Sequence, residues 1–87
     1  MAHLESWARA RRGVEAFVEP RTAVTDTTVL LVASSGEWTR RAVTDPRAAG
    51  ELAKRLAIPV YDAGVLGYPA RMREWNRRQK QAGAGAD

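Results

Sequence analysis

The stretch from Thr27 to Val43 constrains the fold more than any other part of this chain. Residues 28–32 are aliphatic or β-branched at every position, which is typical of a strand whose two faces are both covered. Ser35-Gly36 then supplies a tight turn, because glycine accepts the positive φ that such turns need. A second strand follows over residues 38–43. The stretch therefore predicts a β-hairpin.

The turn also decides which residues of the two strands share a face. We predict that Ala33 pairs with Trp38 across the turn. This register places Trp38, Arg40 and Ala42 beside Val29, Leu31 and Ala33, and it places Thr39 and Arg41 beside Leu30 and Val32. Neither face is purely apolar, so we expect an arginine to reach out from a partly covered edge on its aliphatic stem.

Periodicity and turn residues predict five further elements. In chain order they are a helix over about 3–12, a strand over 14–19, a helix from Asp45 to Leu56, a short strand over 58–61, and a helix from Pro69 to about Lys80. Residues 62–68 are predicted to form a loop with two glycines. Asp45 is suited to cap the second helix and Pro46 to occupy its first position.

This order predicts a single small α+β domain over residues 1–81. We expect the arrangement α-β-β-β-α-β-α, with an antiparallel three-stranded sheet, a short fourth strand and a basic C-terminal helix. Residues 82–87 are predicted to be a disordered Gly/Ala tail. The predicted core comprises Val14, Val18, Val29, Leu31, Leu52, Leu56, Ile58 and Val60.

Composition narrows the class of protein. The 87 residues are enough for one domain, and the absence of cysteine excludes disulfides, thiolate chemistry and cysteine metal sites. No run approaches the length of a membrane span, and the N-terminal residues lack the apolar core of a secretion signal. We therefore expect a cytoplasmic protein without a membrane contact.

Charge indicates the kind of partner. The net charge is +4 and the pI about 10.3, which favours polyanionic or acidic partners. Arginine outnumbers lysine, and its planar fork suits phosphate and carboxylate groups. Part of this excess is expected from codon usage in high-GC genomes.

The last predicted helix concentrates these cations. Helical spacing places Met72 and Trp75 on one face and Arg73, Arg77 and Lys80 on the opposite face. We predict that this helix contacts nucleic acid or a nucleoprotein assembly, since several cations on one surface neutralise phosphates and an exposed tryptophan stacks on bases. The predicted binding residues are Arg71, Arg73, Arg77, Arg78, Lys80 and Trp75, with Arg40 and Arg41 as supporting charges.

A protein-interaction or homodimerisation module is the alternative. Trp38, Trp75 and the two tyrosines then form an arginine-rimmed patch for an acidic partner. A contiguous apolar patch on the surface favours this alternative, whereas exposed cations on one surface favour nucleic acid.

No catalytic set is recognisable in the sequence. His3 has no second histidine or cysteine for a metal site, and the spacing of the serines does not indicate an activated nucleophile. Tyr61, Asp62 and Tyr68 are the only polar and aromatic group suited to line a pocket, and we interpret them as a cover of the core. We therefore predict a protein that binds rather than catalyses, with no metal and no cofactor.

Three segments carry a resemblance to a known family. Residues 28–41, 58–63 and 67–73 resemble a family of small uncharacterised proteins from high-GC bacteria, over a span from Glu5 to about Arg78. Some members carry an automated oxidoreductase label, so the resemblance implies a small enzyme as a third possibility. The chain has neither the dinucleotide glycine fingerprint nor the cysteine pair that such activity uses.

A second resemblance concerns topology alone. The order of helix, three strands, helix and strand is similar to the core of the restriction-endonuclease-like nucleases. Asp26 matches the position of their first acidic residue, but Thr39-Arg40-Arg41 stands where the second acid and the lysine belong. Without the second carboxylate a divalent metal lacks its bridge, so this resemblance implies a catalytically inactive core.

Overall fold

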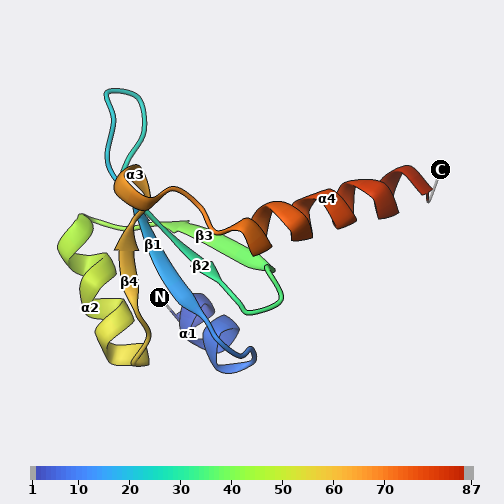
Figure 1. Ribbon diagram of the computed structural model, residues 1–87. Coiled ribbons are helices and arrows are strands. Elements are labelled where there is room, and N and C mark those ends of the chain that lie inside the picture. The colour runs from blue at the N-terminus through green and yellow to red at the C-terminus, as the bar shows by residue number, and fades with distance from the viewer. Residues whose placement is uncertain (1, 86–87) are drawn as a thin grey trace.

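The computed structural model describes residues 2–85, which form an α+β domain with a four-stranded mixed sheet (Figure 1). Its elements are α1 (Ala2–Arg9), β1 (Glu15–Glu19), β2 (Thr28–Val32), β3 (Trp38–Ala42), α2 (Pro46–Leu56), β4 (Val60–Asp62), α3 (Ala63–Leu66) and α4 (Ala70–Gly85). The predicted class and chain order are confirmed, and α3 is an additional short helix within the segment predicted to be a loop.

The fourth strand joins the same sheet as the other three. The strand order is β3-β2-β1-β4, in which β2 is antiparallel to both of its neighbours and β4 is parallel to β1. The parallel pairing becomes possible because α2 carries the chain across the sheet before β4 begins. The sheet therefore has β3 and β4 as its two edges.

The predicted register of the β2–β3 hairpin is wrong by one residue. Val32 pairs with Trp38 and Leu30 with Arg40, and the Ala33 N–H donates to the Glu37 carbonyl at 2.8 Å. The turn is thus one residue tighter than predicted. Because side chains alternate along a strand, this slip moves Trp38 and Arg40 to the face of Leu30 and Val32.

Each face of the sheet carries its own apolar cluster. The larger cluster joins α1 and α2 to one face; its buried members are Leu4, Trp7, Ala8, Val14, Ala16, Val18, Val29, Leu31, Ala33, Ala49, Leu52 and Ala53. The smaller cluster joins α3 and the start of α4 to the other face, through Phe17, Leu30, Val32, Ala63 and Met72. The second face is therefore covered by α3, which lies in a segment predicted to be a loop, and by the start of α4, a helix predicted to be shorter.

Most of the predicted core is confirmed. Val14, Val18, Val29, Leu31 and Leu52 are buried, and Leu56 and Ile58 pack against the larger cluster while partly exposed. Val60 is 44% exposed, so its assignment to the core is wrong. It lies on the edge strand β4, in which only Tyr61 is partly covered.

The helix ends follow their local sequence where that signal is strong. The Asp45 side chain accepts a hydrogen bond from the Ala48 N–H at 2.9 Å and Pro46 opens α2, as predicted. In the same way Asp62 accepts from the Gly64 N–H at 2.7 Å and begins α3. α1 ends at Arg9, three residues before the end predicted for it.

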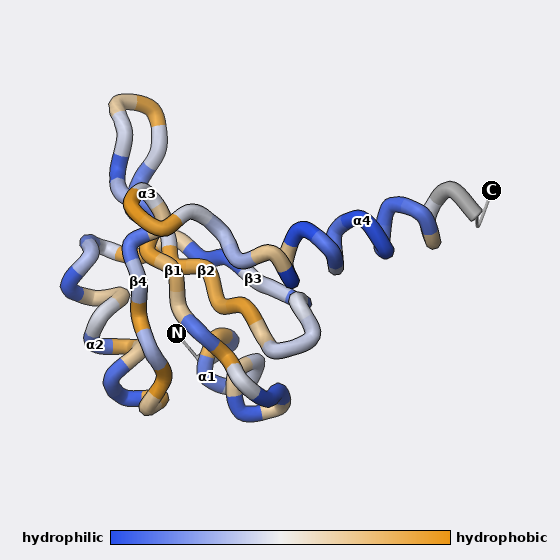
Figure 2. The backbone as a smooth tube through the Cα atoms, viewed as in Figure 1, coloured by the Kyte–Doolittle hydropathy of each residue, from blue (hydrophilic) through white to orange (hydrophobic). Residues whose placement is uncertain are grey.

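The last helix is longer than predicted. α4 continues to Gly85 and so includes residues 82–85 of the predicted disordered tail, whereas residues 86–87 lie outside the described residues. Alanine, the best helix former, alternates with glycine here and offsets part of the cost of glycine. Figure 1 shows that the C-terminal part of α4 projects away from the sheet, and Figure 2 shows that this part is largely hydrophilic.

Candidate functional site

The excess positive charge of the protein lies entirely in α4. This helix holds five of the 14 basic residues of the chain and one of the 10 acidic residues. Nine basic and nine acidic residues therefore remain elsewhere, so the net charge of α4 equals the +4 of the whole chain. The rest of the sequence is electrically balanced.

One side of α4 is fixed to the β2–β3 hairpin. Met72 is buried in the smaller apolar cluster, and the Trp38 Nε1–H donates to Asn76 Oδ1 at 2.7 Å. Gly36 lies so close to the helix that a Cβ built on it would be 2.8 Å from the Cβ of Trp75. Trp75 is half-buried by this packing and is not a free stacking surface.

Arg71 belongs to this docking contact. Its Nε donates to the Ala33 carbonyl at 2.9 Å, and its Nη2 binds Glu15 Oε1 at 2.5 Å. The side chain is 29% exposed. Arg71 thus satisfies a carbonyl at the end of β2 and a carboxylate at the start of β1, and it is not free to bind a phosphate.

Arg40 is also engaged within the protein. Its Nε and Nη2 bind the two carboxylate oxygens of Glu19 at 2.6 and 2.8 Å, and its guanidinium lies 5.2 Å from the centre of the Trp38 ring. The hydroxyl groups of Thr28 and Tyr68 donate to the same carboxylate. Burial opposes ionisation of Glu19, but these hydrogen bonds outweigh it and lower the pKa of the carboxyl group.

Arg41 lies on the opposite face of β3 from Arg40. It is exposed, and its Nη1 donates to the Arg40 carbonyl at 2.9 Å. The two arginines predicted to support nucleic-acid binding are therefore not brought together. Of these two arginines, Arg40 is paired with Glu19, whereas Arg41 has no carboxylate partner among the described residues and presents its charge to solvent.

The outer side of α4 carries the accessible cations. Arg73, Arg77 and Lys80 are exposed and follow helical spacing along the side that faces away from the hairpin. Arg73 donates to the Tyr68 carbonyl at 2.8 Å, and Arg77 pairs with Glu74 one turn earlier. Both contacts are solvent-exposed, so they leave the guanidinium groups accessible.

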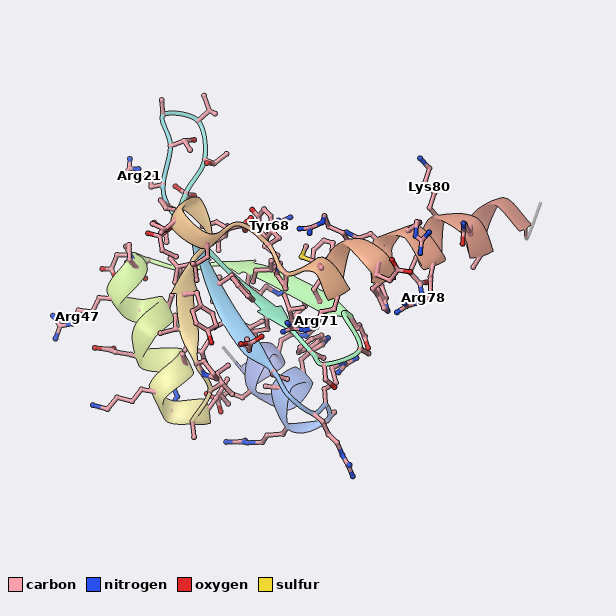
Figure 3. The ribbon with its side chains drawn as sticks, viewed as in Figure 1. Arg21, Arg47, Tyr68, Arg71, Arg78 and Lys80 are labelled. Atoms are coloured by element: carbon pink, nitrogen blue, oxygen red, sulfur yellow. The ribbon has the colours of Figure 1, made fainter. Side chains whose placement is uncertain are left out.

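Arg78 points the other way. Its Nη2 donates to the Ser35 carbonyl in the hairpin turn at 3.1 Å, and Figure 3 shows Arg78 and Lys80 on opposite sides of α4. The predicted binding residues on α4 therefore divide into two groups. Arg71, Trp75 and Arg78 face the hairpin, whereas Arg73, Arg77 and Lys80 form what we call the outer face.

The structure separates the three residues suggested to line a pocket. Tyr61 packs against Phe17, with ring centres 5.4 Å apart, and Asp62 caps α3. Tyr68 lines a pocket of about 450 Å³ together with Glu19 and Arg40. Its hydrogen bond to Glu19 raises the pKa of the Tyr68 hydroxyl.

The Glu19 carboxylate in this pocket is engaged by neighbouring side chains. The carboxylate of Glu19 already accepts hydrogen bonds from Arg40, Tyr68 and Thr28, so its lone pairs are largely satisfied. Among residues 2–85, no group of three or more potential ligands is arranged to hold a metal ion. The cluster is best described as a cross-link between β1, β3 and the segment before α4.

Sequence reasoning missed Glu19 as the centre of that cross-link. The cross-link depends on the pairing of Glu19, at the end of β1, with Thr28 on β2. The error in the hairpin register hid it, because it assigned Arg40 to the opposite face of the sheet. With the observed register, Glu19 and Arg40 lie on one face with β2 between them.

Comparison of the chain with protein-family models, with curated proteins and with solved structures gives no match. The resemblances described from the sequence therefore stay predictions. Within the described part of the chain, none of the helices has both the length and the apolar character needed to cross a membrane.

Proposed function

We propose that this protein is a small nucleic-acid-binding domain that contacts phosphates through the outer face of α4. The observation that carries the proposal is the confinement of the whole net charge of +4 to this one projecting helix. A cationic surface gains affinity for a polyanion by releasing condensed counterions. Arg73, Arg77 and Lys80 are the residues placed to do so.

The absence of an apolar stripe on the outer part of α4 supports the same assignment. Beyond Trp75 the helix continues as Asn-Arg-Arg-Gln-Lys-Gln, which contains no apolar side chain. A helix of this kind gains little from packing against another protein, because hydrophobic burial drives most such contacts. Phosphate groups, by contrast, need only accessible cations and donors.

The test measures binding over a range of salt concentrations. Fluorescently labelled DNA and RNA, single- and double-stranded, are titrated with wild type and with a variant that combines Arg73→Ala, Arg77→Ala and Lys80→Ala. Loss of three phosphate contacts is expected to make the slope of log K against log salt shallower by about 2 to 3. Binding is expected to weaken for every sequence tested.

A matched control removes the same charge elsewhere. Arg12, Arg47 and Lys54 are exposed cations outside α4, so their combined replacement by alanine lowers the net charge equally. This variant is expected to retain most of the affinity and the wild-type salt slope. Equal losses in the two triple variants would show that binding follows net charge alone and would refute a contact through α4.

A second candidate function rests on a different surface. Val65 and Leu66 on α3 are 80% and 63% exposed, next to the partly exposed Tyr68. An apolar patch of this kind suits a protein partner or a second copy of the chain. We propose it as the alternative, and light scattering of wild type and of Val65→Ser with Leu66→Ser tests whether this surface forms a homodimer.

A further inference from the structure

We infer that the ligand is a double-stranded B-form DNA and that α4 binds it in the major groove. This inference rests on the proposed function and names its substrate class. Two observations carry it: the aromatic side chains of the protein are engaged within the fold, and the cationic outer face belongs to a helix that projects from the domain (Figure 1).

The first observation argues against a single strand as the preferred ligand. Proteins that bind single strands stack successive bases on exposed aromatic side chains. Here Trp7 and Phe17 are buried, and Tyr61, Trp38 and Trp75 are half-buried in the two apolar clusters or against the hairpin.

Tyr68 is the remaining aromatic residue, and it also makes a hydrogen bond within the fold. It is the most exposed aromatic residue in the described part of the chain, at 39%, and its hydroxyl group donates to Glu19. A single ring held in this way does not make a platform for successive bases. The protein therefore has the charge for a polyanion without the surface for an unpaired strand.

The second observation concerns shape. α4 has 16 residues and is about 24 Å long. An α-helix with its side chains is about 10–12 Å in diameter, which matches the major groove of B-form DNA at about 12 Å. The major groove of A-form RNA is deep and narrow and does not admit a helix.

The outer face is free to enter such a groove. The contacts of α4 with the β2–β3 hairpin lie on its other side, at Arg71, Trp75 and Arg78. On the outer face Arg73 donates to the Tyr68 carbonyl just before the helix, and Figure 3 shows Lys80 directed away from the hairpin. Arg73 and Lys80 are seven positions apart and so span about 10 Å of the helix axis. That length covers about three base pairs.

Gln81 adds a means of reading bases. It is exposed and lies four positions after Arg77, so helical spacing places it beside the cations of the outer face. A glutamine side chain can form two hydrogen bonds to the edge of adenine in the major groove. Arg73, Arg77 and Lys80 then contact phosphates, while Gln81 reaches the bases.

The test compares three ligands of one sequence and one length. They are a DNA duplex of about two helical turns, the corresponding RNA duplex and a single DNA strand. We expect the protein, residues 1–87, to bind the DNA duplex about tenfold or more tighter than either of the others. Equal or tighter binding of the single strand or of the RNA would overturn this inference. If that binding still weakened in the Arg73, Arg77 and Lys80 variant, the proposed function would stand.

The failure of the proposed function gives a different result. In that case none of the three ligands binds more tightly to wild type than to the triple variant. Both the proposed function and the inference would then be refuted.

A second experiment tests which groove of the DNA the helix enters. Bulky glucosyl groups on the cytosines fill the major groove, whereas a small ligand bound in the minor groove leaves it open. We expect glucosylation to weaken binding at least about tenfold and the minor-groove ligand to change it less than about twofold. The opposite pattern would overturn the assignment of the groove.

Gln81→Ala separates base contacts from phosphate contacts. This variant is expected to lose preference among sequences that differ in adenine content, by about 5- to 150-fold at the contacted position, with an unchanged salt slope. A change in the salt slope with no change in preference would contradict a base-reading role for Gln81.

Discussion

Replacement of Gly36 by alanine tests whether α4 is fixed to the β2–β3 hairpin. Gly36 has a φ of +93°, and a Cβ at this position would lie 2.1 Å from the Arg71 carbonyl oxygen. The positive φ costs about 1–2 kcal/mol for a residue with a side chain. Relief of the overlap with the helix backbone costs about 1–3 kcal/mol more. We expect Gly36→Ala to lower the free energy of unfolding by about 2–5 kcal/mol.

Two other glycines separate these costs. Gly67 also has a positive φ, +72°, but a Cβ there would have no neighbour within 4 Å; Gly50 in α2 has neither the positive φ nor a neighbour. Gly67→Ala is therefore expected to cost about 1–2 kcal/mol, and Gly50→Ala to stabilise the protein by about 0.5–1 kcal/mol.

Urea denaturation followed by tryptophan fluorescence compares the three variants with wild type. In thermal unfolding of the same proteins, a loss of 2 kcal/mol or more is expected to lower the Tm by about 8 °C or more in a domain of this size. The reasoning is refuted if Gly36→Ala destabilises the protein no more than Gly67→Ala. That result would mean that α4 does not lie against the hairpin in solution.

Three further predictions concern polar contacts. Asp45→Ala removes the cap of α2 and is expected to cost about 1 kcal/mol in thermal unfolding, whereas Asp45→Asn should cost much less. Ionised Glu19 stabilises the fold because its pKa is lowered from 4.5, so wild type should lose more stability than Glu19→Gln as the pH falls from about 6 to 3; equal losses would contradict this. Arg71→Lys should lower the urea midpoint but leave the salt slope of nucleic-acid binding unchanged, since Arg71 is engaged with Glu15.

Local sequence was enough to predict the elements whose signals are local. Asp45 and Pro46 set the start of α2, and the alternation that ends at Pro20 set the end of β1. Each depends on residues a few positions apart, so no knowledge of the rest of the fold was needed. The confirmed class and chain order follow from these signals.

The hairpin register could not be predicted in the same way. β2 is apolar on both faces apart from Thr28, and β3 carries an arginine on each face, so hydrophobic pattern does not distinguish a three-residue turn from a four-residue turn. The choice depends on Gly36 fitting under α4, which is a contact between segments far apart in the chain. The pairing of Glu19 with Arg40 was missed for the same reason.

The candidate site was predicted in part. Periodicity alone distinguished the outer cations of α4 from Met72 and Trp75, because the two groups fall on opposite sides of any helix. It could not show that Arg71 is held by Glu15 and the Ala33 carbonyl, since both partners come from the sheet. Spacing along the helix thus does not show that Arg71 is a docking residue, whereas Arg73 and Arg77 remain exposed.

The free end of α4 provides the last prediction. Arg73, Arg77 and Lys80 are like charges at spacings of three and four residues, and such pairs destabilise a helix by about 0.2–0.5 kcal/mol each. Within the described residues, the hydrogen bonds from α4 side chains to the hairpin extend no further than Arg78. The amides after this point should therefore exchange rapidly with solvent in the free protein.

Binding to a polyanion should reverse this behaviour, because phosphates neutralise the repulsion and contact the helix directly. We expect hydrogen exchange of residues 79–85 to slow in the presence of a DNA duplex, and to remain fast in the variant that lacks Arg73, Arg77 and Lys80. Exchange in α2, whose charges lie away from the outer face, serves as the internal control. Binding without added protection in α4 would place the contact elsewhere on the domain, because a helix that carries the phosphate contacts cannot be as open when bound as when free.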